Sequence, residues 1–318
     1  MSSAGDQETS RLDDAARAGW LYYVAGNTQD EIARKLGVSR QTAQRLVSLA
    51  VSEKLVKVRL DHPIASCMEL ARGLSEKFGL ATCEVAPTDP DAPAALTGIA
   101  QIAAGEIERI LKSDHPKIIA LGTGRALRAC VEQLPKMDCP QHRIVSLLGN
   151  MMSDGAATPY NVVIRMADRV NARHYPMPLP VFARSVEEKQ LLQQQEAVHN
   201  ILELARQADV TYVGIGNIGD QAPLMIDGFV SREEMRALLK AGGVGEITSW
   251  VFDREGRLID GLTNDRVASA LLEAAPSKPV IAIAVGALKV DAIMAALRGK
   301  LINGLITDEA TAESLLNF

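Results

Sequence analysis

Continuous apolar runs of six to eight residues alternate with helical patterns from residue 117 to the end of the chain. A strand that is apolar on both faces must be covered on both faces, and the helices between the runs supply that cover. The runs are KIIALG (117–122), RIVSLLG (143–149), DVTYVGIG (209–216), PVIAIAVG (279–286) and LINGLITD (301–308). The pattern therefore predicts an α/β domain built on a mostly parallel, Rossmann-like sheet.

Helical patterns fill the segments between these runs. We expect helices over residues 62–79, 96–111, 159–171, 187–207 and 231–242, and another that begins at Arg125. The segment EITSWVFD (246–253) alternates apolar and polar residues, which predicts one further strand. The helix that begins near Pro63 is expected to connect this domain, residues 61–318, to an N-terminal domain of residues 1–60.

The stretch TQDEIARKLGVSRQTAQRLV, near the N-terminus, has a different pattern. Thr28 and Glu31 have the spacing of a capping box at the start of a short helix. Gly37 can take the positive φ that often ends a helix, and Ser39 is a suitable N-cap for a second one. Two helices joined by a tight glycine turn predict a helix-turn-helix, with a preceding helix over residues 12–25 as its third member.

The second helix of this pair would place polar and basic side chains on its outer face, where they can contact base edges in the major groove. The segment KLVKVRL (54–60) alternates like a short strand, which makes the domain winged-helix-like. The predicted contacts to double-stranded operator DNA, some to bases and some to phosphates, are Thr28, Ser39, Arg40, Gln41, Thr42, Gln44, Arg45 and Lys57. The alternative is a helical pair that only packs or dimerises.

Charge is distributed unevenly between the two predicted domains. Residues 1–60 hold nine Lys or Arg against seven Asp or Glu, whereas the remainder holds 25 against 32. The N-terminal domain is therefore basic and the C-terminal domain acidic, which indicates that only the N-terminal domain binds an anionic partner.

Several classes of protein do not fit the sequence. No apolar run reaches the length of a membrane span, and the polar first residues lack the apolar stretch of a signal peptide. The four cysteines show no C-x-x-C pairing and no metal-ligand spacing. We therefore expect a cytoplasmic protein with reduced thiols and without a metal site, a cofactor or a membrane partner.

Glycine is concentrated where the predicted strands end. The motifs are GTGR (122–125), LGN (148–150), GIGNIGD (214–220), GGVGE (242–246) and VGALK (285–289). Ligands of parallel sheets bind beyond the carboxyl ends of the strands, where glycine allows close approach and a helix start offers free N–H groups. Together with the Thr123 hydroxyl and the Arg125 guanidinium, this predicts a phosphate or polyol site.

Each of these motifs also has a simpler interpretation. Glycine is common in tight turns between strands and helices, and Lys289 could be a solvated side chain, although a cation at a helix start is unfavourable to the dipole. GIGNIGD loosely resembles a dinucleotide fingerprint, but no acidic residue follows at the required spacing within a clear βαβ unit.

Longer motifs are similar to those of a known family. WLYYVAGNTQDEIARKLGVSRQTAQRLV resembles the N-terminal domain of SorC-family bacterial transcriptional regulators. IIALGTGRAL, GGVGEITSWVFDREG, NDRVASALLEA and VGALKVDAIMAALRGKLINGLITDEATAESLL follow in the family's order. The resemblance covers nearly the whole chain from about Leu12. It implies a DNA-reading domain fused to a sugar-binding domain related in fold to phosphosugar isomerases and deaminases.

The resemblance also implies which residues bind the effector. Carried over by motif, they are Gly122, Thr123, Gly124, Arg125, Gly149, Asn150, Gly245, Glu246, Asp253 and Lys289. Glu246 stands where many members have Asp. Its longer side chain keeps the charge but places the carboxylate farther out, so the site can select a ligand of a different shape. Asp253 could equally be a turn residue. GEITSW resembles the branch that includes erythritol regulators.

Two functions are compatible with these residues. The first is a transcriptional regulator of a carbohydrate or polyol catabolic operon, acting as a homo-oligomer, dimer or tetramer, and controlled by a sugar, polyol or sugar phosphate. The second is a phosphosugar isomerase or deaminase with an N-terminal appendage. Proton abstraction requires a positioned base, and no acid–base pair with catalytic spacing is evident. The basic hairpin has no role in an enzyme, so we expect a regulator without enzymatic activity.

Overall fold

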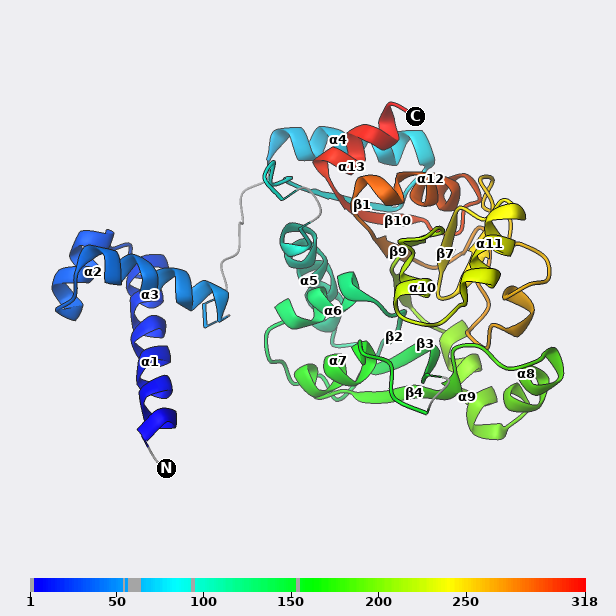
Figure 1. The fold of residues 1–318 in the computed structure, drawn as a ribbon, viewed down its shortest axis with the longest axis horizontal. Helices are drawn as coiled ribbons and strands as arrows, with labels where there is room; N and C mark the ends of the chain where they lie inside the picture. The colour runs from blue at the N-terminus through cyan, green and yellow to red at the C-terminus, as the bar shows by residue number, and fades with distance from the viewer. Residues whose placement is uncertain (1–2, 54, 57–63, 93–94, 153–154) are drawn as a thin grey trace. The chain divides into compact units, whose positions relative to one another are not determined.

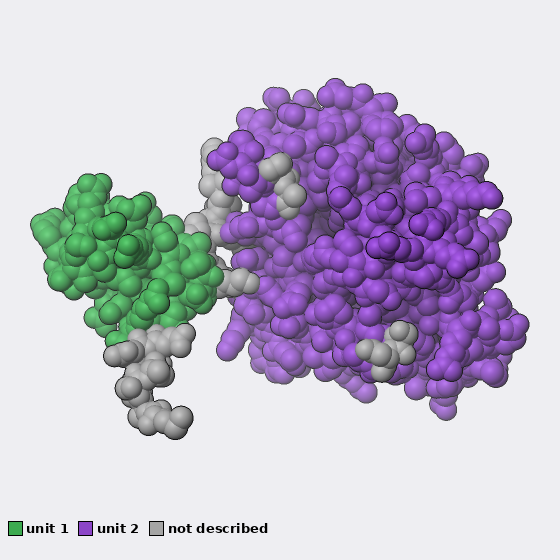
Figure 2. Space-filling model, in the orientation of Figure 1, with its two compact units in different colours: residues 1–62 green, residues 63–318 purple. Residues whose placement is uncertain are grey.

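The computed structural model describes residues 3–53, 55–56, 64–92, 95–152 and 155–318. It divides into two compact units, Met1–His62 and Pro63–Phe318, which are coloured green and purple in Figure 2. The predicted domain boundary at residues 60–61 and the predicted contact residue Lys57 lie outside the described residues.

The first unit contains three helices, α1 (Ser3–Tyr23), α2 (Gln29–Leu36) and α3 (Arg40–Ser52). The capping box is present, because the Thr28 hydroxyl accepts from the Glu31 N–H and the Glu31 carboxylate accepts from the Thr28 N–H. Gly37 has φ 69°, and the Ser39 hydroxyl accepts from the N–H of Thr42. The sequence-based prediction of a capped helical pair is therefore confirmed.

A small apolar core holds these helices together. Ala18 of α1, Ile32 of α2, and Ala43 and Val47 of α3 are buried in it. Of the predicted strand 54–60, only residues 55 and 56 are described. Helix α1 begins earlier than the predicted start at residue 12.

The second unit is built on a seven-stranded sheet in the order β1-β10-β9-β5-β2-β3-β4, and every pair of neighbours is parallel. The strands are β1 (Thr82–Ala86), β2 (Ile118–Leu121), β3 (Arg143–Met151), β4 (Arg173–Pro180), β5 (Val210–Val213), β9 (Val280–Ile283) and β10 (Gly304–Asp308). The five apolar runs predicted as strands all lie in this sheet, which confirms the predicted fold class.

The two edge strands were not predicted, and their sequences explain why. β4 has the sequence RHYPMPLP, whose three prolines argue against a strand. Proline lacks the N–H that a central strand must donate, but an edge strand can accommodate it. β1 is also an edge strand, and only its last two residues are buried.

Helices cover both faces of the sheet (Figure 1). α5 (Thr97–Leu111), α6 (Arg125–Gln133) and α7 (Val162–Val170) pack on one face, where Ile107, Leu127 and Met166 are buried. α4 (Ala65–Phe78), α9 (Glu196–Arg206), α12 (Val290–Arg298) and α13 (Glu309–Leu316) pack on the other. Successive strand residues point to opposite faces, so Ile119 belongs to the first cluster and Ala120 to the second.

One predicted helix is divided in two. Residues 187–207 form α8 (Val186–Gln193) and α9, separated at Gln194 and Gln195. α8 has no buried residue, whereas α9 buries Val198, Leu204 and Ala205. α9 is therefore packed more deeply than α8, which contributes the partly buried Leu192, and the polar glutamines at the break gave no stop signal.

The predicted strand EITSWVFD is instead a hairpin, so that prediction was wrong. β7 (Gly245–Ile247) and β8 (Trp250–Phe252) pair antiparallel, and β6 (Gly216–Asn217) pairs with β7. The two turn residues, Thr248 and Ser249, have φ 49° and 73°. A two-residue turn with positive φ at both positions is ordinarily signalled by Asn or Gly, which this sequence lacks.

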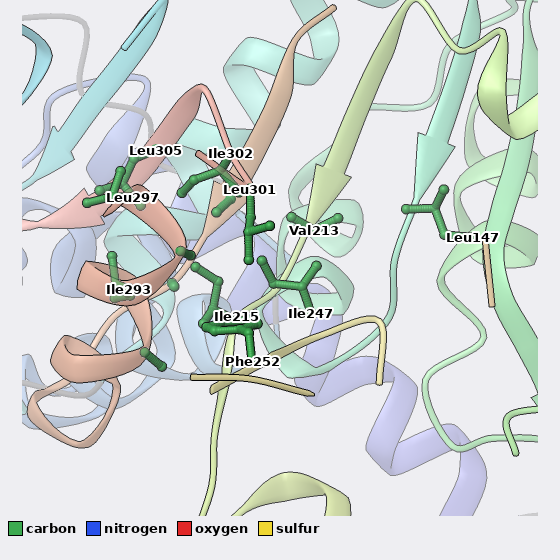
Figure 3. Close-up of a cluster of buried hydrophobic side chains, with 14 of the residues drawn as sticks. Leu147, Val213, Ile215, Ile247, Phe252, Ile293, Leu297, Leu301, Ile302 and Leu305 are labelled. Atoms are coloured by element: carbon green, nitrogen blue, oxygen red, sulfur yellow. The ribbon is translucent and has the colours of Figure 1, made fainter. Parts of the chain in front are cut away.

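The hairpin is held against α12 by the larger core of the second unit. Figure 3 shows Ile247 and Phe252 together with Ile293 and Leu297 in this cluster. Three short helices, α10 (Pro223–Ile226), η1 (Asn264–Arg266) and η2 (Ala287–Lys289), and the longer α11 (Arg232–Lys240) complete the unit. No helix within the described ranges is long and apolar enough to cross a membrane.

Candidate functional site

The parallel sheet reverses its direction of winding between β2 and β5. From β2 the chain adds β3 and β4 on one side, whereas β5 is followed on the other side by β9 and β10. Ligands of open α/β sheets bind beyond the carboxyl ends of the strands at such a switch point. A cavity of about 680 Å³ lies there.

Segments that follow four neighbouring strands line this cavity. The wall includes Thr123, Gly214 and Gly286, which follow β2, β5 and β9 in turn. It also includes Leu148, which lies in the second half of β3. The β7–β8 hairpin adds Glu246, Thr248 and Ser249. Five of the ten predicted effector residues therefore lie on the cavity wall: Thr123, Gly124, Arg125, Glu246 and Lys289.

Thr123, Gly124 and Arg125 form the turn into α6. Gly124 has φ 116°, which an L side chain rarely adopts, and it is the N-cap of the helix. The first N–H groups of a helix carry a partial positive charge and lack intrahelical partners. The Thr123 hydroxyl and these groups together can donate hydrogen bonds to ligand oxygens.

An ion pair crosses the cavity wall at this turn. Arg125 Nη2 lies 3.4 Å from Asp227 Oδ1, and the Tyr160 hydroxyl donates to Asp227 Oδ2 at 2.7 Å. The Asp227 side chain is only 14% exposed. Burial, with the bond to Asp227, raises the pKa of Tyr160, so its hydroxyl remains a donor at neutral pH.

Glu246 is held by the hairpin turn. Its Oε2 accepts from the Ser249 N–H at 2.8 Å. Its Oε1 lies 2.2 Å from the ideal Cβ position of Gly216, so a side chain at residue 216 would displace the carboxylate. Burial raises the pKa of Glu246, while the Ser249 N–H and the charge of Lys289 oppose the increase.

Lys289 is half-buried on the cavity wall at the last position of η2. Burial lowers its pKa, and the nearby charge of Glu246 counteracts this effect. Its ammonium forms no hydrogen bond and no ion pair with the described part of the chain. It is therefore a donor without a hydrogen-bond partner among the described residues that line the cavity, and Glu246 lines the same cavity.

Gly122, Gly149 and Asn150 do not line this cavity. They line an adjoining space of about 20 Å³, the size for one water molecule, which shares Thr123 and Leu148 with the cavity. Gly149 has a packing role as well, because a Cβ at this position would lie 2.3 Å from the carbonyl oxygen of Leu179. β3 and β4 change register at Gly149, which explains the close approach of the two backbones.

We expect Gly149→Ala to lower the free energy of unfolding of the second unit by about 1–3 kcal/mol, because backbone atoms would have to move. Gly73→Ala in α4 is the matched control, since its Cβ would lie 3.4 Å from Leu316 methyl groups. Urea unfolding followed by Trp250 fluorescence in a Trp20→Phe background measures both. Equal stability of the two variants would contradict a packing role.

Two other predicted residues have structural roles outside the cavity. A Cβ on Gly245 would lie 2.6 Å from the Cβ of Ala292 and 2.7 Å from the Phe252 ring, so glycine lets β7 pack on α12. Asp253 accepts from the N–H groups of Glu255 and Arg257, and its carboxylate pairs with the Arg257 guanidinium at 2.9 Å. The turn-residue interpretation of Asp253 agrees with this geometry.

Six of the predicted DNA-contact residues, Ser39 to Thr42, Gln44 and Arg45, lie on α3 and at its start, whereas Thr28 is the N-cap of α2 and Lys57 lies outside the described residues. Arg40, Gln41, Gln44 and Arg45 are exposed, and Arg40 has only a loose ion pair, 3.5 Å to Asp30, with both side chains mostly in solvent. The hydroxyls of three predicted contact residues already form hydrogen bonds at the helix starts. Thr28 bonds to Glu31, and the hydroxyls of Ser39 and Thr42 bond to each other at 2.9 Å. Arg and Gln side chains are those that recognise guanine and adenine in the major groove.

Sequence reasoning missed Tyr160 and Asp227. They are 67 positions apart, and Asp227 follows a helix of four residues that reads as a turn. Only the sheet topology brings the two side chains together. No cluster of three or more His, Cys, Asp or Glu side chains that could hold a metal ion exists among the residues described.

Known proteins of similar sequence and fold are transcriptional regulators. The family model "Putative sugar-binding domain" matches residues 62–317. The erythritol catabolism regulatory protein EryD of Brucella abortus (strain 2308) is 35% identical over 302 residues, 95% of this chain and 96% of that protein. The deoxyribonucleoside regulator of Bacillus subtilis (strain 168) is 29% identical over 317 residues, 98% of this chain and 99% of that regulator.

The fold comparison agrees. The full-length sorbitol operon regulator SorC from Klebsiella pneumoniae has a TM-score of 0.70 and 26% identity, and the match covers 96% of this chain and 99% of that one. Both units therefore have counterparts in a single known protein.

Proposed function

The chain belongs to the SorC family of sugar-binding transcriptional regulators, and we propose that it controls genes of carbohydrate or polyol catabolism. Its first unit binds operator DNA, and its second unit binds a small polyhydroxylated effector. Relatives named for erythritol and deoxyribonucleosides support a polyhydroxylated ligand for this chain as well.

The cavity at the strand switch point is the observation that carries this proposal. Its polar groups include donors, such as Thr123 and Lys289, and carboxylate acceptors, Asp227 and Glu246. Sugar and polyol hydroxyls both donate and accept hydrogen bonds, so a wall that offers both kinds of partner matches them. We assign effector binding to Thr123, Gly124, Arg125, Glu246 and Lys289, together with Asp227.

Effector binding can change transcription only if the ligand binds one state of the protein more tightly than another. The test is a fluorescence assay of operator release, in which polyols, sugars and sugar phosphates are added to the full-length protein on a labelled duplex. At least one compound is expected to release the protein from the operator duplex or to tighten its binding there. An unchanged duplex affinity across the panel, with no calorimetric binding, would contradict the proposal.

The enzyme alternative is tested with the same compounds. Glu246 and Lys289 provide a carboxylate and an amine in one cavity, and both groups can act as general acids or bases. We propose that they bind rather than catalyse. Turnover of any sugar phosphate in the panel, detected by loss of substrate and abolished in Glu246→Gln, would favour the enzyme instead.

We also propose that the protein acts as a homo-oligomer, a dimer or a tetramer. One helix-turn-helix reads few base pairs, so operators are usually bound as two half-sites by two copies. Sedimentation at micromolar concentration, with and without the operator duplex, should give a mass of at least two chains. A monomer under both conditions would exclude this arrangement.

A further inference from the structure

Acidic and basic side chains are equal in number on the cavity wall. Among the described residues that line it, Arg125 and Lys289 are basic, and Asp227 and Glu246 are acidic. A site for a phosphate normally offers an excess of positive charge and N–H donors, because the ligand carries up to two negative charges. Here Arg125 pairs with Asp227, and Lys289 shares the cavity wall with Glu246.

The Arg125 guanidinium on this wall already forms an ion pair. Arg125 pairs with Asp227 at the start of α6, where an anion would otherwise gain most from the helix dipole. Asp227 cannot easily turn away, because Tyr160 donates to its second oxygen at 2.7 Å and the side chain is largely buried. A phosphate at the Thr123–Arg125 turn would therefore lie close to a carboxylate that is held in place.

Lys289 and Glu246 line the same cavity, although they form no ion pair within the described part of the chain. The Glu246 carboxylate accepts from the Ser249 N–H at 2.8 Å, so a phosphate near Lys289 would share the cavity with a second acidic side chain that is held in place. The other polar groups of the wall include uncharged side chains, among them Asn217 and Gln221. Neutral hydroxyls can bond to all of these groups without adding charge.

We propose that the effector is a neutral polyhydroxylated molecule without a phosphate group, and that Asp227 is the residue that excludes phosphorylated analogues. This inference rests on the proposed effector site. At a separation of several ångströms and an effective dielectric constant of about 20, one carboxylate disfavours a second negative charge by on the order of tenfold to a hundredfold in affinity.

Calorimetry on the full-length protein tests the inference with erythritol, xylitol and sorbitol and with their monophosphates. The wild-type protein should bind at least one polyol, and the matching monophosphate at least about tenfold more weakly. Asp227→Asn keeps the size and the acceptor for Tyr160 but removes the charge. It should bind the monophosphate about tenfold more tightly than the wild type does.

Two controls separate charge from shape. Tyr160→Phe removes the hydroxyl that holds Asp227 but keeps the charge of the carboxylate, so it should gain less affinity for the monophosphates than Asp227→Asn does. Asp114→Asn removes an exposed carboxylate before β2, at the opposite edge of the sheet, and should leave the preference unchanged. The wild-type ratio also tests the inference if a variant does not fold.

The outcomes are distinguishable. A monophosphate that binds the wild type as tightly as its polyol, or more tightly, would overturn the inference and leave the proposed regulator intact. An unchanged monophosphate affinity in folded Asp227→Asn would overturn the role of Asp227. Binding of neither class, without any effect on operator affinity, would contradict the proposed effector site itself.

Discussion

Replacing Arg40 and Arg45 together by alanine should reduce the affinity for a specific operator by roughly thirtyfold or more. Each guanidinium that pairs with a base contributes about 1–3 kcal/mol, so the double variant loses about 2–6 kcal/mol. Both side chains are exposed on α3, so the helix does not depend on them for packing. Fluorescence anisotropy with a duplex selected from random sequences by the wild-type protein measures the change.

The expected loss is a loss of specificity as well as of affinity. Affinity for unrelated duplexes should fall much less, because base contacts carry sequence information and phosphate contacts do not. Arg206→Ala is a suitable control, since Arg206 is also an exposed arginine with one ion pair, at 2.9 Å to Glu203, but lies in the second unit. If the double variant keeps full operator affinity, α3 is not the recognition helix.

The helical pair could be predicted because local chemistry determines it. The capping box, Gly37 and Ser39 each act within four residues of the chain, and the structure shows every one of these contacts. The central strands of the large sheet were predicted for a related reason. A strand covered on both faces must be apolar throughout, and this property is visible without knowledge of its neighbours.

The cavity could be predicted only in part. Thr123, Gly124 and Arg125 follow a recognisable strand and open a helix, so the sequence places them at the sheet's ligand-binding edge. Tyr160 and Asp227 follow no such rule, because their positions depend on how distant segments return to that edge. The β7–β8 hairpin was missed because Thr248 and Ser249 adopt positive φ without a glycine or asparagine signal.

The same limits explain the predicted residues that lie away from the cavity. Gly149 and Gly245 are glycines because neighbouring backbone or side-chain atoms leave no room for a Cβ. A motif cannot distinguish that requirement from close approach to a ligand, since both select glycine. Asp253 likewise satisfies two backbone N–H groups of its own turn.

Lys289→Ala should weaken binding of the polyol effector by about 1.5–3 kcal/mol, roughly tenfold or more, because a charged donor to a ligand hydroxyl is lost. Thr123→Val, which keeps the shape and removes one hydroxyl, should lose about 0.5–1.5 kcal/mol. Both variants should bind the operator normally in the absence of effector. Calorimetry and operator anisotropy on the same preparations test both statements, with the exposed Lys240→Ala as control.

Measuring the stability of Lys289→Ala distinguishes a lost ligand contact from a general defect in folding. The ammonium of Lys289 is half-buried, and burial disfavours its charged form, which is the reason for its lowered pKa. Such a group does not stabilise the ligand-free fold, so Lys289→Ala should unfold at the same urea concentration as the wild type or a higher one. A variant that is stable, binds DNA and has lost the effector would identify Lys289 as a ligand contact. If Lys289→Ala keeps full effector affinity, the effector does not bind at this wall of the cavity.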